Sequence, residues 1–323
     1  MAAPKVSIVM PAYKSADFIG LAIASVRAQT LQDWELIIVD DCSPDDTAAA
    51  ALAAAGGDPR IKLVRADTNG GVARARNLGN THATGDWIAV LDSDDAFEPA
   101  RLETLIQAAE SADLDLIADD MLVVPFDSLM GEGTPYIGSP HAALKPVDLP
   151  AWMAGNSAGI KTPMLGYLKP MVRRDFLARH EVAYFPELRV AEDAWFVADL
   201  LAYGARFALY PAPLYRYAVR PASLSRTRGD NVYTLQRAVY APFIKRHESR
   251  LSQPGLRAVR RHEAALKDAE AFEGFAISLQ KHQFLQAAAW IWSQPLSIRH
   301  IVKPISNRLK RMGLVRQNPG IAQ

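Results

Sequence analysis

The first hundred residues alternate between short apolar runs and segments with helical periodicity, and this alternation constrains the fold most strongly. Apolar, β-branched runs without strict alternation are typical of strands that are buried on both faces of a parallel sheet. Four such strands are predicted, at Lys5–Met10, Glu35–Val39, Ile61–Val64 and Trp87–Leu91. Helices are predicted to follow them at Asp17–Gln29, Asp45–Ala55, Val72–Thr81 and Pro99–Ala109. This order predicts right-handed βαβ units around a mostly parallel, Rossmann-like α/β sheet.

Polar side chains stand at the ends of three of these strands. Tyr13 follows the first strand, Asp40 and Asp41 close the second, and Asp92 and Asp94 follow the fourth. In open α/β sheets, ligands bind beyond the carboxyl ends of the strands. The sequence therefore predicts one polar crevice to which several strands contribute.

The Asp92-Ser93-Asp94 segment is the strongest candidate for cation binding. In an extended segment residues i and i+2 point the same way, so we expect both carboxylates to face one point. Mg²⁺ is often held by one or two carboxylates together with substrate phosphate oxygens. We interpret the segment as a site for a metal–diphosphate. An acidic turn, or an N-cap of the helix at Pro99–Ala109, is the alternative.

Two common nucleotide-binding motifs are missing. The first strand leads into Met10-Pro11-Ala12-Tyr13, without the G-x-G-x-x-G of a dinucleotide-binding domain, and the chain has no P-loop. A nicotinamide dehydrogenase or an ATPase of those types is therefore disfavoured.

Composition excludes several further classes. The chain has 36 Lys and Arg against 35 Asp and Glu, a net charge of +1, which argues against a chain devoted to nucleic-acid binding. Cys42 is the single cysteine, so no intramolecular disulfide can form. The apolar runs are too short to span a membrane, and no signal peptide precedes the first strand. We expect a cytoplasmic protein.

Five segments together resemble a known family. VSIVMPAY, ELIIVDDCSPDDT, NGGVARARNLG, GDWIAVLDSDD and AEDAWF resemble the family 2 glycosyltransferases of the GT-A fold, in order and in spacing, over about residues 5–225. The stretch from Asp119-Asp120 through YLKPMVRRDFL to YRYAVRPASLSR most resembles the exopolysaccharide glucosyltransferases of the succinoglycan type.

The resemblance implies a site for a UDP-sugar. Tyr13, in the motif Pro11-Ala12-Tyr13, would flank the uracil. Asp41 would accept a hydrogen bond from the uracil N–H, with Asp40 as a second candidate for that role.

The resemblance also implies that Arg74 or Arg76 approaches the uracil or the phosphates. Helical residues two apart do not share a face, so we expect one contact and favour Arg76; a solvated helix face with a supporting arginine is the alternative. Asp92 would hold the ribose or sugar hydroxyls beside Ser93. Asp94, together with Asp92, would form the metal site for Mn²⁺ or Mg²⁺.

The same resemblance assigns the chemistry to Glu192 and Asp193, in the first turn of a helix predicted at Arg189–Tyr203. Acids are common there simply because they complement the helix dipole. The family match makes Asp193 the general base of an inverting transfer, and Glu192 would orient it or the acceptor. Many relatives carry a histidine in the segment matching residues 215–225, where this chain has Ala218-Val219-Arg220. Arg220 either neutralises the diphosphate or belongs to a loop that only packs.

Two domains are expected. Residues 1–228 would form the GT-A domain, with a nucleotide-sugar half (1–118) and an acceptor half (119–228) whose residues Met121–Lys169 are loops and short elements. Residues 229–323 would form a helical region, with helices at Asn231–Arg250, Gly255–Lys281 and Phe284–Ser293 and with Pro242 and Pro254 as interruptions.

The end of the chain is basic and apolar. From Lys281 it has seven Lys and Arg and no acid, with Trp and Ile residues between them. Such a composition indicates peripheral contact with an anionic membrane, here the inner face of the cell membrane. A helix packed on the catalytic domain and a disordered end are the alternatives.

The predicted reaction is non-processive transfer of a hexose, glucose from UDP-glucose, to a polyprenyl-diphosphate-linked saccharide. No nucleic-acid partner is expected, and a homodimer is compatible with the chain. A nucleotidyltransferase is one alternative, but it would usually have a Gly- and Arg-rich loop after the first strand. A non-catalytic nucleotide-sugar-binding module is the other, and the intact acidic set argues against it.

Overall fold

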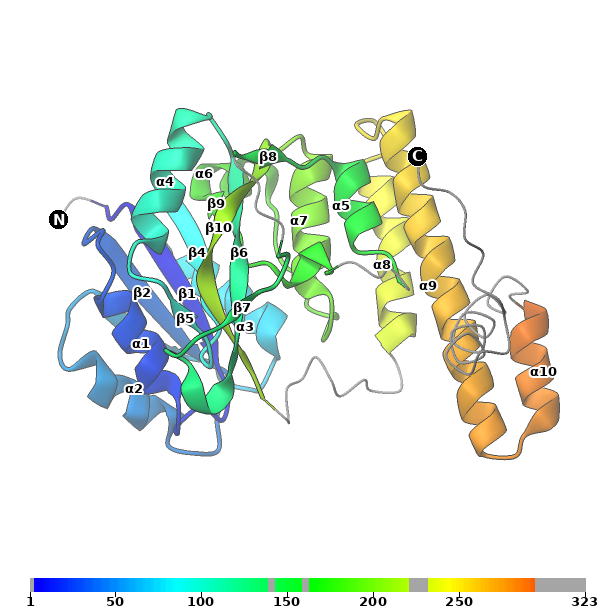
Figure 1. Cartoon of the computed structure of the whole chain (residues 1–323), viewed down its shortest axis with the longest axis horizontal. Coiled ribbons are helices and arrows are strands. Elements are labelled where there is room, and N and C mark those ends of the chain that lie inside the picture. The colour runs from blue at the N-terminus through cyan, green and yellow to red at the C-terminus, as the bar shows by residue number, and fades with distance from the viewer. Residues whose placement is uncertain (1–2, 139–142, 159–162, 221–231, 294–323) are drawn as a thin grey trace, which may run out of the picture.

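A computed structural model describes residues 3–138, 143–158, 163–220 and 232–293 of the chain (Figure 1). Its centre is a mixed sheet with the strand order β3-β2-β1-β4-β9-β6-β10-β5. The strands are β1 Val6–Ala12, β2 Trp34–Asp40, β3 Ile61–Arg65, β4 Trp87–Val90, β5 Ala96–Phe97, β6 Leu116–Pro125, β7 Thr134–Pro135, β8 Lys145–Pro146, β9 Met171–Arg173 and β10 Phe207–Val219. The predictions for the basic tail beyond residue 293 lie outside the described residues.

The first half of the sheet confirms the predicted βαβ pattern. β3, β2, β1 and β4 pair in parallel, and every residue of β1, β2 and β4 is buried, which explains their unbroken apolar runs. The connecting helices are α1 Ile19–Arg27, α2 Thr47–Ala55 and α3 Val72–His82, followed by α4 Arg101–Ser111. Parallel pairing brings the carboxyl ends of β2, β1 and β4 to one edge of the sheet.

The second half is less parallel than predicted. β9 runs antiparallel between β4 and β6, whereas β6 and β10 pair in parallel. The interpretation of Met121–Lys169 as loops and short elements is wrong at its start, because β6 continues to Pro125. Further along the chain, Tyr215–Val219 forms the end of β10. The Pro-, Gly- and Met-rich composition of this stretch hid the strand. Within β6, the buried carboxylate of Asp119 is paired with Arg101 at 2.7 Å.

Helices surround the sheet and continue beyond it. They are α5 Leu149–Gly155, α6 Arg174–His180, α7 Glu192–Ala202, α8 Val232–Arg246, α9 Gln253–Gln280 and α10 Phe284–Ser293, with short 3₁₀ turns at Phe126–Ser128 and Leu165–Tyr167. Pro242 lies inside α8, so its prediction as an interruption is wrong. Pro254 lies in the first turn of α9, where a missing N–H costs no helical hydrogen bond.

The C-terminal helices are attached to the sheet domain through α5 and α7. Trp195 of α7 packs edge-on against Tyr240 and Phe243 of α8, with ring centroids 4.7 and 5.3 Å away. His262 of α9 lies 3.0 Å from the Asn156 carbonyl oxygen after α5. Within the described residues, no helix combines the length and the apolar character that crossing a bilayer requires.

Candidate active site

The acidic segment after β4 forms a turn. The Asp95 N–H donates to the Asp92 carbonyl oxygen at 3.0 Å, so the prediction of an extended segment is wrong. The Asp95 carboxylate accepts from the Tyr215 hydroxyl at 2.7 Å and from the Ala218 N–H at 2.8 Å, and the Asp92 N–H donates to the Tyr215 oxygen. β10 therefore holds the turn in place at the carboxyl edge of the sheet.

Five charged side chains from distant segments form one cluster, in which Arg76, Lys169 and Asp193 are buried and Asp92 and Glu192 are partly exposed. Arg76 of α3, only 1% exposed, donates to Asp92 at 2.7 Å, to Asp193 at 2.6 Å and to Glu192 at 3.1 Å. The Lys169 ammonium lies 2.7 Å from Asp193 and 3.0 Å from Asp92. The two cations thus connect the turn after β4 to the first turn of α7, and both oxygens of Asp92 and of Asp193 are engaged.

Burial and charge act in opposite directions within this cluster. Burial raises the pKa of Asp92, but Lys169 and Arg76 outweigh it and hold that pKa well below its usual range. Burial and the neighbouring Asp193 raise the pKa of Glu192 to about 7. Asp92 is therefore a permanent anion, whereas Glu192 exchanges its proton near neutrality.

Lys169 was not predicted as a site residue. Its segment, YLKPMVRRDFL, contributed to the family resemblance but received no role, because only the fold brings it to Asp92 and Asp193. Its carbonyl oxygen accepts from Arg101 at 2.6 Å, and Arg101 is fixed by the buried pair with Asp119. The one signal in the sequence is a lysine between the apolar residues of YLKPM, a weak hint of a buried cation with acidic partners.

Asp94 lies apart from this cluster and faces Arg220. The two side chains form an ion pair at 2.7 Å, and the guanidinium carbon lies 4.5 Å from the ring centroid of Phe18 and 5.5 Å from that of Phe126. Burial and the nearby Asp92 raise the pKa of Asp94, and Arg220 opposes them. Arg220 thus packs on two rings and also reaches the acidic turn. Whether it neutralises a diphosphate stays a prediction.

The carboxylates differ in what they offer a metal ion. Asp92 already neutralises two cations and Asp95 accepts from Tyr215 and Ala218, whereas Asp94 lies outside the cluster and pairs with Arg220. Among the described residues, no group of three His, Cys, Asp or Glu side chains is arranged to hold a metal. An ion such as Mg²⁺ or Mn²⁺ still fits at Asp94, because such ions often use one carboxylate, substrate phosphate oxygens and water.

Tyr13, which is predicted to flank the uracil, is exposed to solvent. Its ring is exposed at the end of β1, whereas Pro11 and Ala12 are buried inside the strand. The Ser93 hydroxyl lies 2.8 Å from that of Ser15, which ties the acidic turn to the loop after Tyr13.

Asp40 and Asp41 are already engaged by the protein. Asp40 accepts from the Ser43 N–H at 3.0 Å and from Arg65 at 3.2 Å. Asp41 accepts from the N–H groups of Gly70 and Gly71 at 2.8 and 2.7 Å. Asp41 thus positions the loop before α3, and each of its oxygens keeps further capacity to accept a hydrogen bond.

Arg74 and Arg76 point in different directions from α3, as predicted. Arg74 is exposed, whereas Arg76 is buried against the acids. Which of the two contacts a nucleotide stays a prediction.

The raised pKa of Glu192 predicts a pH-dependent stability. The folded state holds this proton more tightly than the unfolded chain, whose Glu192 has the ordinary pKa of 4.5. The resulting stabilisation is complete below about pH 4.5 and is lost as the pH rises through about 7. Relative to Glu192→Gln, we expect the wild-type free energy of unfolding to fall by about 1–3 kcal/mol across this window.

Urea unfolding of both proteins at about pH 5 and about pH 8 measures this difference. Glu187→Gln, which removes an exposed carboxylate shortly before α7, is the matched control and should leave the pH dependence of the wild type unchanged. A difference between the wild type and Glu192→Gln that is the same at both pH values would contradict the prediction.

A Rossmann-like sheet with an acidic turn after β4 and a second acidic pair at the start of α7 defines a GT-A glycosyltransferase, and solved structures of that class share the fold. A Staphylococcus aureus TarS structure in complex with UDP-GlcNAc matches 90% of this chain and 92% of its own, with a TM-score of 0.61 and 18% identity. The mannosyltransferase PcManGT of Pyrobaculum calidifontis, in complex with GDP-Man and Mn²⁺, matches 96% of this chain and 81% of its own with a TM-score of 0.55 and 18% identity.

The chain belongs to glycosyltransferase family 2. The model of "Glycosyl transferase family 2" matches residues 7–128. The succinoglycan biosynthesis protein ExoO of Rhizobium meliloti (strain 1021) is 35% identical over 96% of this chain and 87% of its own length. ExoU of the same organism, also a succinoglycan biosynthesis protein, is 33% identical over 92% of this chain and 85% of its own. The protein is therefore a glycosyltransferase, as the motifs predicted.

A third relative has a more specific name. The Escherichia coli protein WfgD, a UDP-Glc:α-D-GlcNAc-diphosphoundecaprenol β-1,3-glucosyltransferase, is 35% identical over 39% of this chain and 49% of its own length.

Proposed function

We propose that this enzyme transfers one hexose, with inversion, from a UDP-sugar to a lipid-linked saccharide during exopolysaccharide biosynthesis. The observation that carries the proposal is the charged cluster at the sheet edge. In it, Arg76 and Lys169 hold Asp193 at 2.6 and 2.7 Å and hold Asp92 at 2.7 and 3.0 Å. Asp193, the carboxylate assigned to the acceptor, and Asp92, the one assigned to the donor sugar, are thereby held at fixed positions relative to each other.

The donor is proposed to be UDP-glucose. Tyr13 would flank the uracil and Asp41 would accept from its N–H, with Asp40 beside it. Support for the nucleotide comes from the UDP-GlcNAc complex of the TarS structure, and support for glucose comes from the name of WfgD.

Asp193 is proposed as the general base. The acceptor hydroxyl attacks the anomeric carbon from the face opposite the diphosphate, the new C–O bond forms as the bond to the diphosphate breaks, and the hydroxyl proton passes to the Asp193 carboxylate. Arg76 and Lys169 fix the orientation of that carboxylate. Glu192, adjacent to it, would orient the acceptor.

The departing UDP carries the negative charge that develops during transfer. Arg220, which pairs with Asp94 at the acidic turn, would neutralise it, and Asp94 would hold Mn²⁺ or Mg²⁺. A divalent ion bound there would stabilise the leaving diphosphate.

The acceptor is proposed to be a saccharide on a polyprenyl diphosphate. Support comes from the lipid-linked acceptor in the name of WfgD and from the exopolysaccharide context of ExoO and ExoU. Because such an acceptor is anchored in a bilayer, we propose that the enzyme works at the inner face of the cell membrane.

A UDP-release screen tests the proposed function. The purified enzyme is incubated with several UDP-sugars and Mn²⁺ or Mg²⁺, with and without a lipid-linked acceptor extract. We expect UDP release to be fastest with UDP-glucose and to rise when the extract is added. Release that never depends on an acceptor would contradict the proposal, and pyrophosphate production from UTP and a sugar 1-phosphate would indicate a nucleotidyltransferase.

A further inference from the structure

The hairpin formed by the end of α9 and by α10 exposes large apolar side chains. Within the described part of the chain, nine large apolar side chains are exposed, and five of them lie in this hairpin. Those five are Ile277, Leu279, Phe284, Leu285 and Trp292. Leu285 is 91% exposed and Trp292 is 89% exposed, values expected for free side chains rather than for parts of a core. We call these five residues the apolar hairpin surface.

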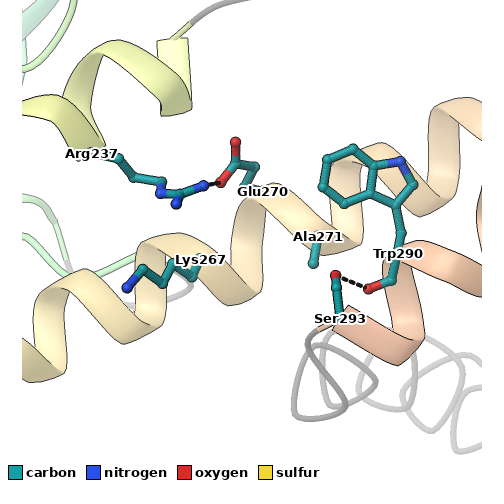
Figure 2. Close-up of a pocket in the computed structure, with 6 residues that line it drawn as sticks. All are labelled: Arg237, Lys267, Glu270, Ala271, Trp290 and Ser293. Atoms are coloured by element: carbon teal, nitrogen blue, oxygen red, sulfur yellow. Dashed lines mark hydrogen bonds and ion pairs between the residues drawn. The ribbon is translucent and has the colours of Figure 1, made fainter.

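α10 has two different sides. Trp290 turns toward α9, where a Cβ on Gly274 would lie only 2.3 Å from the indole, so a glycine is needed for this close contact (Figure 2). Leu285 and Trp292 are seven residues apart and therefore share a helix face, and Trp292 is exposed where Trp290 is half-buried. The hairpin is thus held together by one tryptophan and presents the other to the surroundings.

The ionisable residues of the chain from Gly274 onward are all basic, whereas Glu270 of α9, which lies near Trp290 and Ser293, is paired with Arg237 at 2.8 Å. Between Gly274 and Ser293 the only ionisable side chains are Lys281 and His282, both exposed at the turn between the helices. From residue 274 to residue 323 the sequence has seven Lys and Arg and no Asp or Glu. An apolar surface bordered by cations matches an anionic lipid surface, where apolar rings enter the headgroup region and lysines reach the phosphates.

The hairpin is also remote from the nucleotide-binding half. It lies at the end of the molecule opposite α1 and α2 (Figure 1), beyond the part of α9 that packs on α5. Contact there leaves the crevice at the sheet edge uncovered.

We propose that the apolar hairpin surface is the membrane-docking surface of this protein, and that it binds the headgroup region of an anionic bilayer. The hairpin supplies the apolar contact, and the cations of Lys281 and of the following chain supply the preference for anionic lipid. This inference concerns a surface and does not depend on the donor or the acceptor proposed above.

Vesicle cosedimentation of the full-length protein tests the inference. The vesicles contain phosphatidylcholine with about one third phosphatidylglycerol, or phosphatidylcholine alone. We expect the double variant Leu285→Glu, Trp292→Glu to bind the mixed vesicles at least about tenfold more weakly than the wild type. Leu52→Glu, an exposed leucine on α2, is the matched control and should bind like the wild type.

Three further results decide whether this surface is the one that binds lipid. A chain ending at Ser293 keeps the hairpin and loses six of the seven cations, so we expect it to retain binding but to lose the preference for phosphatidylglycerol. If the double variant binds as the wild type does, or if the wild type binds neither kind of vesicle, the inference is wrong. A wild-type dimer that becomes monomeric in the double variant, with no vesicle binding in either, would show that the surface binds a second copy instead.

The double variant also separates this inference from the proposed reaction. UDP release from the donor in solution should stay unchanged in it, because the hairpin contributes nothing to the acidic crevice. Lost vesicle binding with unchanged UDP release supports the docking surface, whatever the sugar or acceptor proves to be.

Discussion

Asp94→Ala is expected to lower the rate of sugar transfer by about two to three orders of magnitude, because the loss of one charge-stabilising contact to the leaving diphosphate costs several kcal/mol. Asp92 is engaged by Arg76 and Lys169, and Asp95 by Tyr215 and Ala218, so we expect no other carboxylate of the acidic turn to replace Asp94. Its removal also frees Arg220 from its ion pair.

Rates of UDP release at increasing Mn²⁺ concentration measure this effect. The wild type should show a saturable gain in rate with metal, and Asp94→Ala should show little or none. Asp175→Ala, a carboxylate 68% exposed on α6, is the control and should behave like the wild type. If Asp94→Ala transfers sugar at the wild-type rate and responds to Mn²⁺ as the wild type does, the assignment of Asp94 as a metal ligand is wrong.

Asp193→Asn is expected to lower the rate of sugar transfer by a similar factor, for a different reason. It removes the proposed general base while keeping the shape of the side chain, and general-base catalysis contributes about 10²–10⁴-fold to rate. We expect the loss in kcat, with affinity for UDP changed by less than about threefold, because the substitution lies on the acceptor side of the cluster.

The substitution also leaves Arg76 and Lys169 with one carboxylate fewer. Breaking a buried ion pair on one side commonly costs about 3–5 kcal/mol of stability, so thermal unfolding and UDP binding are measured together with the rate. A folded, UDP-binding Asp193→Asn enzyme with low kcat supports the assignment. If the folded, UDP-binding variant keeps the wild-type kcat, Asp193 is not the general base, and Glu192 is the next carboxylate to test.

The parallel half of the fold was predictable because its signals are local. The strands β1, β2 and β4 are mostly apolar, and Tyr13, Asp40 with Asp41, and Asp92 with Asp94 stand at their ends, so the carboxyl edge of the sheet could be located from order alone. The second half was harder, because the stretch from Asp119 to Ala183 is rich in Pro, Gly and Met and lacks clean periodicity. The pairing of Asp119 in β6 with Arg101 is visible only in the fold.

The residues of the candidate site also include some that could be predicted from local motifs and one that could not. Asp92 and Asp94 were predicted as site residues from a short acidic motif after a strand, and Glu192 and Asp193 from the family resemblance; their roles stay predictions. Lys169 was not predicted, because a single lysine has no meaning until the chain brings carboxylates to it. The extended geometry assumed for Asp92 and Asp94 also failed, because Tyr215 and Ala218 from β10 hold the segment as a turn.

The sequence by itself therefore determined the family, the order of the first strands and helices, and which acids stand at the edge of the sheet, since all of these depend on residues close together in the chain. Only the tertiary structure decided which cations neutralise those acids, which carboxylate of the acidic turn lies outside the Arg76–Lys169 cluster and which tryptophan of α10 is exposed. Those properties depend on burial and on distances between segments that are about a hundred residues apart, as Arg76 and Asp193 are. In a low-dielectric interior, it is such distances that set the charge state and orientation of a side chain.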